Sequence, residues 1–288
     1  MTPVMPPSPP RHRLGGYREY APPPHLEPFV ESLWTHRAPD ELPPGPGAMH
    51  RVLPDPALSL AFSCRRDAGG RPVDPSVVII GPKHRPHIFA FQPGRELAAV
   101  RVKLEWSAPL LGLDPADHGD AERDLTGVHP RLLAELLEPL AETRAADQAA
   151  CLLAELLACR AGRLDGRAAS PAARALELVR RRSGAVSVDR AADRLGVPLR
   201  TLHRAVHRET GISLKRFARV TRLLAAVTRA DRTAGPSWAA IAADSGFCDQ
   251  SHLVRECRAI AGLAPGEVHR ERRAQEAETS NPRVSGVR

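Results

Sequence analysis

Residues 195–226 read LGVPLRTLHRAVHRETGISLKRFARVTRLLAA, and this stretch decides the fold of the C-terminal third of the chain. A preceding helix must end at Gly196-Val197-Pro198, because glycine accepts the positive φ of a tight turn and proline interrupts a helix. The next segment, 199–209, places Leu202 and Val206 on one helical face. Two helices joined by so short a turn have the spacing of a helix-turn-helix unit.

The same pattern returns further along the chain, at 238–270, which reads WAAIAADSGFCDQSHLVRECRAIAGLAPGEVHR. Residues 238–244 form its first predicted helix, Ser245-Gly246-Phe247 its turn and 249–260 its second helix. Ser213 is the predicted N-cap of a long spacer helix between the two units. Many helical hairpins share this periodicity without touching DNA, but two basic units joined by one helix favour a DNA-binding domain.

The distribution of charge agrees with this interpretation. The chain has a formal net charge of +8. Residues 170–273 hold 20 Lys and Arg against 10 Asp and Glu, whereas residues 1–169 hold 19 against 21. A solvated basic surface is the alternative explanation, but an excess confined to one segment is typical of a nucleic-acid partner. Ser170-Pro171, an N-cap followed by proline, marks the start of this helical domain.

The N-terminal part has a different composition. Residues 1–60 contain 15 of the 29 prolines, and we expect 1–16 to be a disordered, proline-rich segment. Short apolar stretches separated by Gly, Pro and Asp predict a β-rich domain over 17–129, a small sandwich or barrel. Residues 98–104 alternate apolar and basic side chains, which predicts a strand with one buried and one wet face.

Leucine and alanine then recur at helical spacing, with acidic residues on the opposite face. We expect 130–169 to be a helical connector ending in a linker. Its helices either pack against the β domain or form a dimerisation surface, and the sequence favours neither. Residues 274–288 are expected to be a disordered tail.

The two quoted stretches resemble the DNA-binding domain of AraC/XylS-type transcriptional regulators. The resemblance is carried by RETG-x-S with the KRF and RL of the spacer, then by IA-x-x-x-GF-x-DQSH and a later G-x-x-P. Leu253 and Cys257 stand where the family usually has Phe, and Val268-His269 replaces its usual Tyr-Arg. The resemblance implies an all-α C-terminal domain with two helix-turn-helix motifs and a sequence-specific regulator that reads two major-groove boxes.

The N-terminal part weakly resembles the cupin-like sensor domains that precede such DNA-binding domains. The similar stretches are YREYAPPPHLEPFVESLWTHR, RVLPDPALSLAF and RVKLEWSAPLLG. Trp34, Pro54, Asp55 and Arg101 match recurrent positions, although a core Trp and a turn Pro-Asp are the favoured explanation of them. The predicted fold class is therefore α+β with two domains, a cupin-like β-barrel or sandwich followed by helices and then the all-α domain.

In the family, the second helix of each unit enters a major groove. The positions that correspond here are the DNA-binding candidates Arg200, His203, Arg204, His207, Gln250, Ser251, His252 and Arg255. Arginine can pair with guanine through two hydrogen bonds and glutamine with adenine, so these residue types suit base edges. A phosphate contact or plain solvation is the alternative for each of them.

Two other functions were weighed against a regulator. His50, His84 and His87 could meet in a β-barrel as metal ligands of a cupin-like enzyme. His84 and His87 lie in a basic, Gly/Pro-flanked stretch, however, where a solvated loop is simpler and nearby cations disfavour a metal. The third reading makes the N-terminal domain an oligomerisation module without a ligand.

The chain has no GxSxG, P-loop or glycine-rich dinucleotide motif, so we expect no enzyme activity, no catalytic residue, no cofactor and no metal. Its five cysteines form no CxxC pair, and its apolar runs are too short to span a membrane. We expect a cytoplasmic protein whose partner is double-stranded DNA. RNA polymerase, an unidentified small-molecule effector and a second copy of the chain are further candidate partners.

Overall fold

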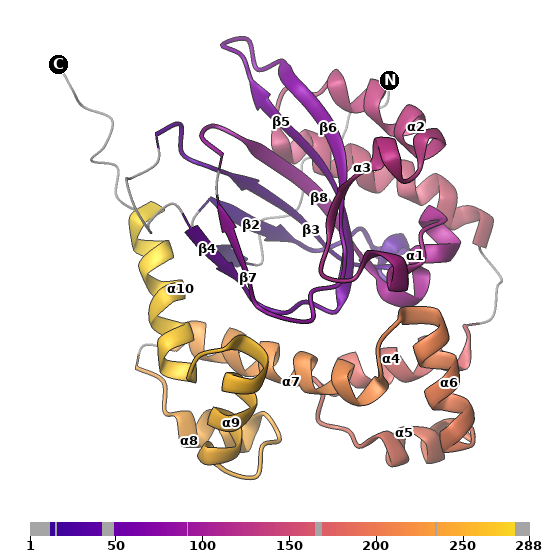
Figure 1. Cartoon of the computed structure of the whole chain (residues 1–288), viewed down its shortest axis with the longest axis vertical. Coiled ribbons are helices and arrows are strands. Elements are labelled where there is room, and N and C mark those ends of the chain that lie inside the picture. Colours follow the sequence, from indigo (N-terminus) through magenta and orange to yellow (C-terminus); the bar gives the residue numbers. More distant parts are fainter. Residues whose placement is uncertain are drawn as a thin grey trace.

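A computed structural model describes residues 12–14, 16–41, 49–90, 92–164, 169–233 and 235–279. The strands are β1 His12–Leu14, β2 Tyr17–Tyr20, β3 Val30–Arg37, β4 Met49–Val52, β5 Ala57–Arg66, β6 Pro72–Ile80, β7 His87–Ala90, β8 Glu96–Lys103 and β9 Glu122–Asp124. The helices are α1 Leu104–Leu111, α2 Pro130–Ala141, α3 Ala146–Ala161, α4 Pro171–Arg181, α5 Val188–Leu195, α6 Leu199–Thr210, α7 Leu214–Asp231, α8 Trp238–Asp244, α9 Gln250–Ala261 and α10 Pro265–Thr279. The two-domain α+β prediction is confirmed: the strands lie in the N-terminal domain, and α4 to α10 form a helical C-terminal domain (Figure 1).

The N-terminal domain is built on an antiparallel sheet of seven strands, in the order β1-β2-β3-β8-β5-β6-β9. A separate two-stranded sheet pairs β4 with β7. Among the described residues no pairing joins β1 to β9, so the larger sheet does not close into a barrel. The strand predicted over 98–104 corresponds to β8, but it lies at the centre of the sheet and both of its faces are largely covered. The expectation of one wet face was wrong.

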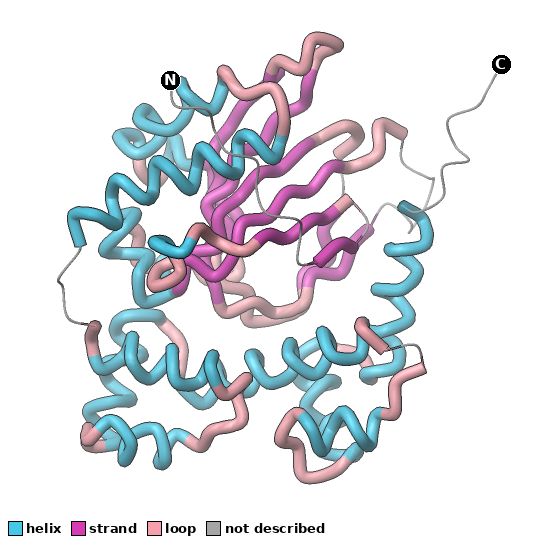
Figure 2. The backbone as a smooth tube through the Cα atoms, turned by 180° about the vertical axis from the view of Figure 1, so that it is seen from behind, coloured by secondary structure: helices cyan, strands magenta, loops and turns pink. Residues whose placement is uncertain are grey.

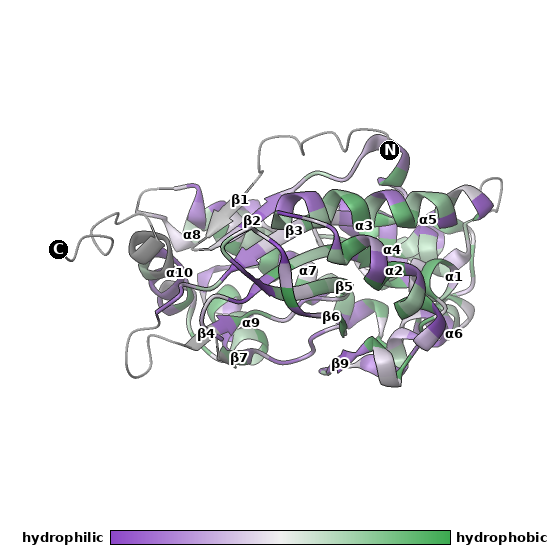
Figure 3. Cartoon of the chain, turned by 90° about the horizontal axis from the view of Figure 1, so that it is seen from above, coloured by the Kyte–Doolittle hydropathy of each residue, from purple (hydrophilic) through white to green (hydrophobic). Residues whose placement is uncertain are grey.

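Helices cover one face of the sheet. Leu132, Leu136 and Leu140 recur every four residues along α2 and are buried toward β6. The buried residues of α3 follow the same helical spacing, and α3 lies along β3 and β8 (Figure 3). These helices therefore pack on the β domain, the first of the two roles considered for the connector.

The helical domain forms a layer beneath the sheet, as the view from behind shows (Figure 2). The predicted N-caps Ser170 and Ser213 each accept a hydrogen bond from a backbone N–H of the first turn of α4 and α7. Ser187 caps α5 and Ser237 caps α8 in the same way. The predicted spacer helix is α7, which joins the two helix-turn-helix units.

Two large hydrophobic cores divide most of the chain, but their boundary does not coincide with the domain boundary. A small third cluster, of Trp34, Ala61, Val78 and Ala99, lies within the N-terminal sheet. The first core runs from the sheet through α1 to α3 and continues into α4, α5, α6 and the start of α7, as far as Phe217 and Ala218. The second core begins at Val220 and contains the rest of α7 with α8, α9 and α10. The first helix-turn-helix unit thus shares its core with the N-terminal domain.

Both chain ends differ from the prediction. Within the expected disordered segment 1–16, His12–Leu14 forms β1 and pairs with β2; residues 1–11 and Gly15 lie outside the described residues. Within the expected tail, residues 274–279 continue α10, and 280–288 lie outside the described residues. The linker positions 165–168 are also outside them. No helix in the described part of the chain is long and apolar enough to cross a membrane.

Candidate nucleic-acid interface

The first helix-turn-helix unit consists of α5 and α6. α5 ends at Gly196, whose left-handed conformation (φ 63°) allows the turn through Val197 and Pro198. α6, the second helix of the unit, begins directly after Pro198 and ends at Gly211, again left-handed (φ 72°). The interior of the unit is small and apolar, because Ala191 and Ala192 of α5 are buried and permit close approach of the two helices.

The second unit consists of α8 and α9 and repeats this arrangement. Gly246, with a φ of 75°, makes its turn, and Asp249 caps α9 by accepting a hydrogen bond of 2.6 Å from the backbone N–H of His252. Leu253 and Cys257, two of the departures from the family pattern, are both buried in the second core. They fill the positions that a larger aromatic side chain would occupy.

Seven of the eight predicted DNA-binding side chains are exposed on the second helix of their unit. They are Arg200, His203, Arg204 and His207 on α6, and Gln250, Ser251 and Arg255 on α9. None of the seven has a hydrogen-bond or ion-pair partner in the described part of the chain. Exposed polar groups without an internal partner are available for an external one, and they lie on one helix of each unit.

His252 differs from these seven. Its Nδ1 accepts a hydrogen bond of 3.3 Å from the backbone N–H of Cys248, and its ring meets Phe247 edge-on with centroids 5.4 Å apart. His252 is half-buried and shapes the turn before α9. The sequence alone could not distinguish this structural role from contact with a base, because His252 directly follows the exposed residues Gln250 and Ser251.

The arginines of α7 are used internally. Arg219 makes two hydrogen bonds, of 2.7 and 3.1 Å, to the carboxylate of Glu256 on α9. Arg222 donates to the carbonyl oxygen of Gly184, before α5, at 3.1 and 2.7 Å, and its guanidinium lies 5.7 Å from the centre of the Phe247 ring. Because Arg222 touches the loop of the first unit and the turn of the second, it holds the two units against each other. The sequence showed these residues only as basic positions away from the apolar stripe.

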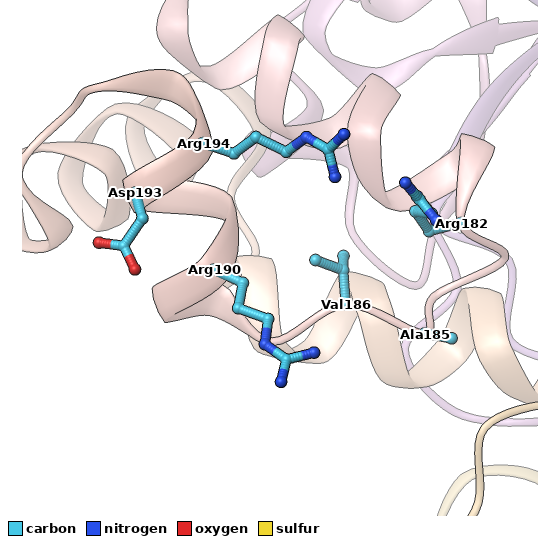
Figure 4. A pocket seen from close by; sticks show the side chains of 6 residues that line it. All are labelled: Arg182, Ala185, Val186, Arg190, Asp193 and Arg194. Carbon is cyan, nitrogen blue, oxygen red and sulfur yellow. The ribbon is translucent and has the colours of Figure 1, made fainter.

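A shallow open groove beside the first unit collects three further arginines that the sequence analysis did not select. It is lined by Arg182, Ala185, Val186, Arg190, Asp193 and Arg194. Figure 4 shows Arg182 and Arg194 reaching over Val186 from two sides, while Asp193 stands at the rim. The three arginines are exposed and have no ion-pair partner among the described residues. Such a groove suits a phosphate group. The sequence could not reveal it, because these arginines look like ordinary solvated residues there.

The N-terminal residues that match recurrent family positions lie together. Arg101 pairs with Asp55 at 2.9 Å and with Glu19 at 2.9 Å, and Trp34 donates to Ser59 at 3.3 Å. Burial raises the pKa of Asp55 to about 6, against the opposing effect of the Arg101 charge. These contacts join β2, β3, β5 and β8. Packing within the domain therefore explains Trp34, Asp55 and Arg101.

Of the histidines in the metal-site alternative, His87 is exposed at the start of β7. His84 lies in the loop after β6; its backbone N–H donates to Asp120, and its carbonyl oxygen accepts from Arg216. The side chain of His50 is outside the described residues. Among the side chains that are described, no group of three His, Cys, Asp or Glu lies close enough to hold a metal ion.

Comparison with known families identifies the helical domain. Residues 191–271, which include both second helices, match the family described as a helix-turn-helix domain. The C-terminal domain is a helix-turn-helix domain of the AraC type. With this AraC-type domain the chain is a DNA-binding transcriptional regulator, and the match points to a regulator family and not to an enzyme family. Residues 18–123 match a family described as a domain of unknown function, DUF6597.

Solved structures similar to the chain include AraC-type regulators. The C-terminal domain of AraT from Geobacillus stearothermophilus is 21% identical, covers 37% of this chain and 89% of its own, and has a TM-score of 0.34. The DNA-binding domain of AdpA, solved with a target DNA, is 22% identical over 38% of this chain and 99% of its own, with a TM-score of 0.35. ToxT from Vibrio cholerae O395 is 10% identical over 83% of this chain and 96% of its own, with a TM-score of 0.41. No curated protein matches the chain.

Proposed function

We propose that the protein recognises DNA sequence with two helices, α6 and α9, each in its own major groove, within one chain. The observation that carries this proposal is the repeated arrangement of exposed, unpartnered side chains on the second helix of both units. α7 has 18 residues, which is about 27 Å at 1.5 Å per residue. Major grooves on one face of B-DNA recur about every 34 Å, so the two boxes should lie one helical turn apart.

The residues divide by chemistry into base readers and phosphate binders. Arg204 on α6 and Arg255 on α9 are the proposed guanine readers, and Gln250 suits adenine. The groove arginines, Arg182 and Arg190 among them, are the proposed phosphate contacts, because they lie on the first helix of the unit and the loop before it rather than on the second helix. The protein would act in the cytoplasm, where it meets DNA.

Selection of binding sites from random DNA tests this proposal with single variants. Arg204→Ala should relax base preference in one box and Arg255→Ala in the other, each by about 1–3 kcal/mol if the contact to guanine is bidentate. Arg229→Ala is the matched control, because Arg229 is also exposed but pairs with Asp244 at 3.0 Å. If both substitutions change the same base positions, or neither changes any, two-box reading is wrong.

The phosphate contacts are tested by the salt dependence of binding. Each lost contact lowers the slope of log K against log salt by about 0.9 and weakens all sequences alike. Arg190→Gln should show this pattern, and a change of base preference instead would place the residue among the readers. RNA polymerase, a small-molecule effector and a second copy of the chain remain predictions, since no described contact tests them.

A further inference from the structure

The first helix-turn-helix unit is attached to the N-terminal domain by a buried ionic cluster. Arg180, near the end of α4, donates to both carboxylate oxygens of Glu105 on α1, at 2.6 and 2.8 Å, and to Glu31 on β3 at 2.8 Å. The side chain of Glu105 is only 2% exposed and that of Arg180 14%. We call these three residues, together with the Lys103–Glu177 pair at 3.2 Å, the interdomain clamp.

The clamp is part of the interior that the two domains share. The guanidinium of Arg180 lies 5.0 Å from the centre of the Phe217 ring, at the start of α7. Burial by itself would lower the pKa of Arg180, but the charges of Glu105 and Glu31 and their hydrogen bonds hold it above its ordinary value. Arg180 is therefore charged, and its bidentate contact with Glu105 fixes the direction of α4 relative to α1.

The second helix of the first unit also touches the N-terminal domain directly. Gly211, the left-handed cap of α6, lies against Ala116; a side chain there would come within 2.9 Å of the Ala116 Cα. α6 packs on α1 and on the short helix Pro115–His118. The start of the helix carries Arg200 and Arg204, while its end is fixed on the other domain.

The second unit is held in another way. Its contacts with the N-terminal domain run mainly through α10, which packs on β1 and whose Glu271 pairs with Arg51 at 2.9 Å through side chains that are 41% and 25% exposed; Leu53 joins the second core. α9 itself is fixed mainly by α7, through the Arg219–Glu256 pair and the second core. The cap of α9, Gly262, has Pro86 nearby at an ordinary contact distance of 3.6 Å.

From this asymmetry we infer that Arg180 is a positioning residue for DNA recognition, through which the N-terminal domain sets the orientation of α6 but not of α9. The inference rests on the proposed function, because it requires two boxes that are read separately. Its consequence is that a change in the N-terminal domain reaches the DNA through the first box. The second box is read by a unit whose second helix is fixed by α7 and the second core, without a buried ionic contact to that domain among the described residues.

The test uses the full chain and three operators: the selected sequence, the same sequence with the first box scrambled, and the same with the second box scrambled. Arg180→Lys keeps the positive charge near Glu105 but removes the planar two-pronged contact. Arg174→Lys is the matched control, since Arg174 also lies on α4 but is exposed and has no side-chain hydrogen bond or ion pair among the described residues. Melting temperature is recorded for every variant.

We expect Arg180→Lys to weaken binding to the operator that retains only the first box by roughly 5- to 150-fold, the usual range of coupling between sites. Binding to the operator that retains only the second box should be unchanged, and Arg174→Lys should change binding to neither operator. Equal weakening of both operators, or of neither, would overturn the inference. If Arg180→Lys does not fold, Glu31→Gln, which removes only the outer contact of the clamp, replaces it with the same two outcomes. Failure of the proposed function looks different, because the unaltered protein would then not distinguish two boxes.

Discussion

The two helix-turn-helix units have the same local design but different surroundings. Each has a serine-capped first helix, a left-handed glycine in the turn and a second helix with exposed, unpartnered side chains. The first unit is built into the core of the N-terminal domain, whereas the second has a core of its own on α7. A repeated sequence pattern therefore predicts that the two units have the same local geometry. It does not predict how firmly each unit is attached to the N-terminal domain.

The largest expected difference between the units concerns the two arginine pairs that hold them. Arg180→Met leaves the carboxylate of Glu105 buried without its partner, which should lower the free energy of unfolding by about 3–5 kcal/mol. Arg219→Met opens the more exposed Arg219–Glu256 pair, with side chains 36% and 20% exposed, and should lower it by about 1 kcal/mol. Urea-induced unfolding measures both. Equal losses would mean that both units are held with similar strength.

The glycine caps of α6 and α9 form a second matched pair. Both are left-handed, at φ 72° and 78°, so Ala should cost about 1–2 kcal/mol at Gly211 and at Gly262. At Gly211 the new Cβ also overlaps Ala116, whereas at Gly262 it meets only ordinary contact. Gly211→Ala should therefore be the more destabilising variant in thermal unfolding. If Gly262→Ala is as damaging, the contact between α6 and the N-terminal domain is weaker than described.

Two buried cysteines report separately on the two cores. Cys64 lies in the first and Cys257 in the second, and burial raises the pKa of both thiols, that of Cys257 to about 12. With Cys151, Cys159 and Cys248 replaced by serine, labelling of the remaining thiols in urea should begin at Cys257. A difference of about 0.5 M would correspond to about 1 kcal/mol at an m-value near 2 kcal/mol/M. Simultaneous labelling would show that the two cores unfold together.

The smallest effect is expected from acid. Burial acts to raise the pKa of Glu177, but hydrogen bonds from Arg181 and Lys103 and the charges of Lys103 and Arg180 outweigh it, so its pKa lies below the ordinary value of 4.5. Its stabilising contribution is thus complete above about pH 4.5 and is lost as pH falls through the lowered pKa. Glu177→Gln should flatten the dependence of melting temperature on pH in this range. An unchanged profile would remove Glu177 from the clamp.

The elements that follow from local rules could be predicted from sequence. The predicted caps Ser170 and Ser213 and the turn glycines lie where the chemistry of helix ends requires them. Several strands, β5 and β8 among them, coincide with short apolar stretches, as expected of strands with buried side chains. Exposure of seven of the eight candidate DNA-binding residues also followed, because helical periodicity separates them from the buried face.

Features that depend on a distant partner could not be predicted. Arg180, Arg219 and Arg222 look alike in the sequence as basic residues on helices, yet each is committed to a different contact far along the chain. The same limit applies to β8. Its basic residues indicated a solvent-exposed face, but Arg101 forms ion pairs with Asp55 and Glu19 inside the domain. A charge pattern shows where side chains are polar, but not which groups satisfy them.

The division of α7 between two cores limits how the sequence of such a protein can evolve. Phe217 and Ala218 belong to the first core and Val220 and Leu223 to the second, so the boundary falls within a single helical turn. Inserting one residue there would rotate one unit against the other by about 100° and shift it by about 1.5 Å. The length of α7 is therefore constrained geometrically, whereas the exposed positions of α6 and α9 can be exchanged without disturbing an internal contact. New operator preferences are accessible by substitution, but a new spacing between the boxes is not.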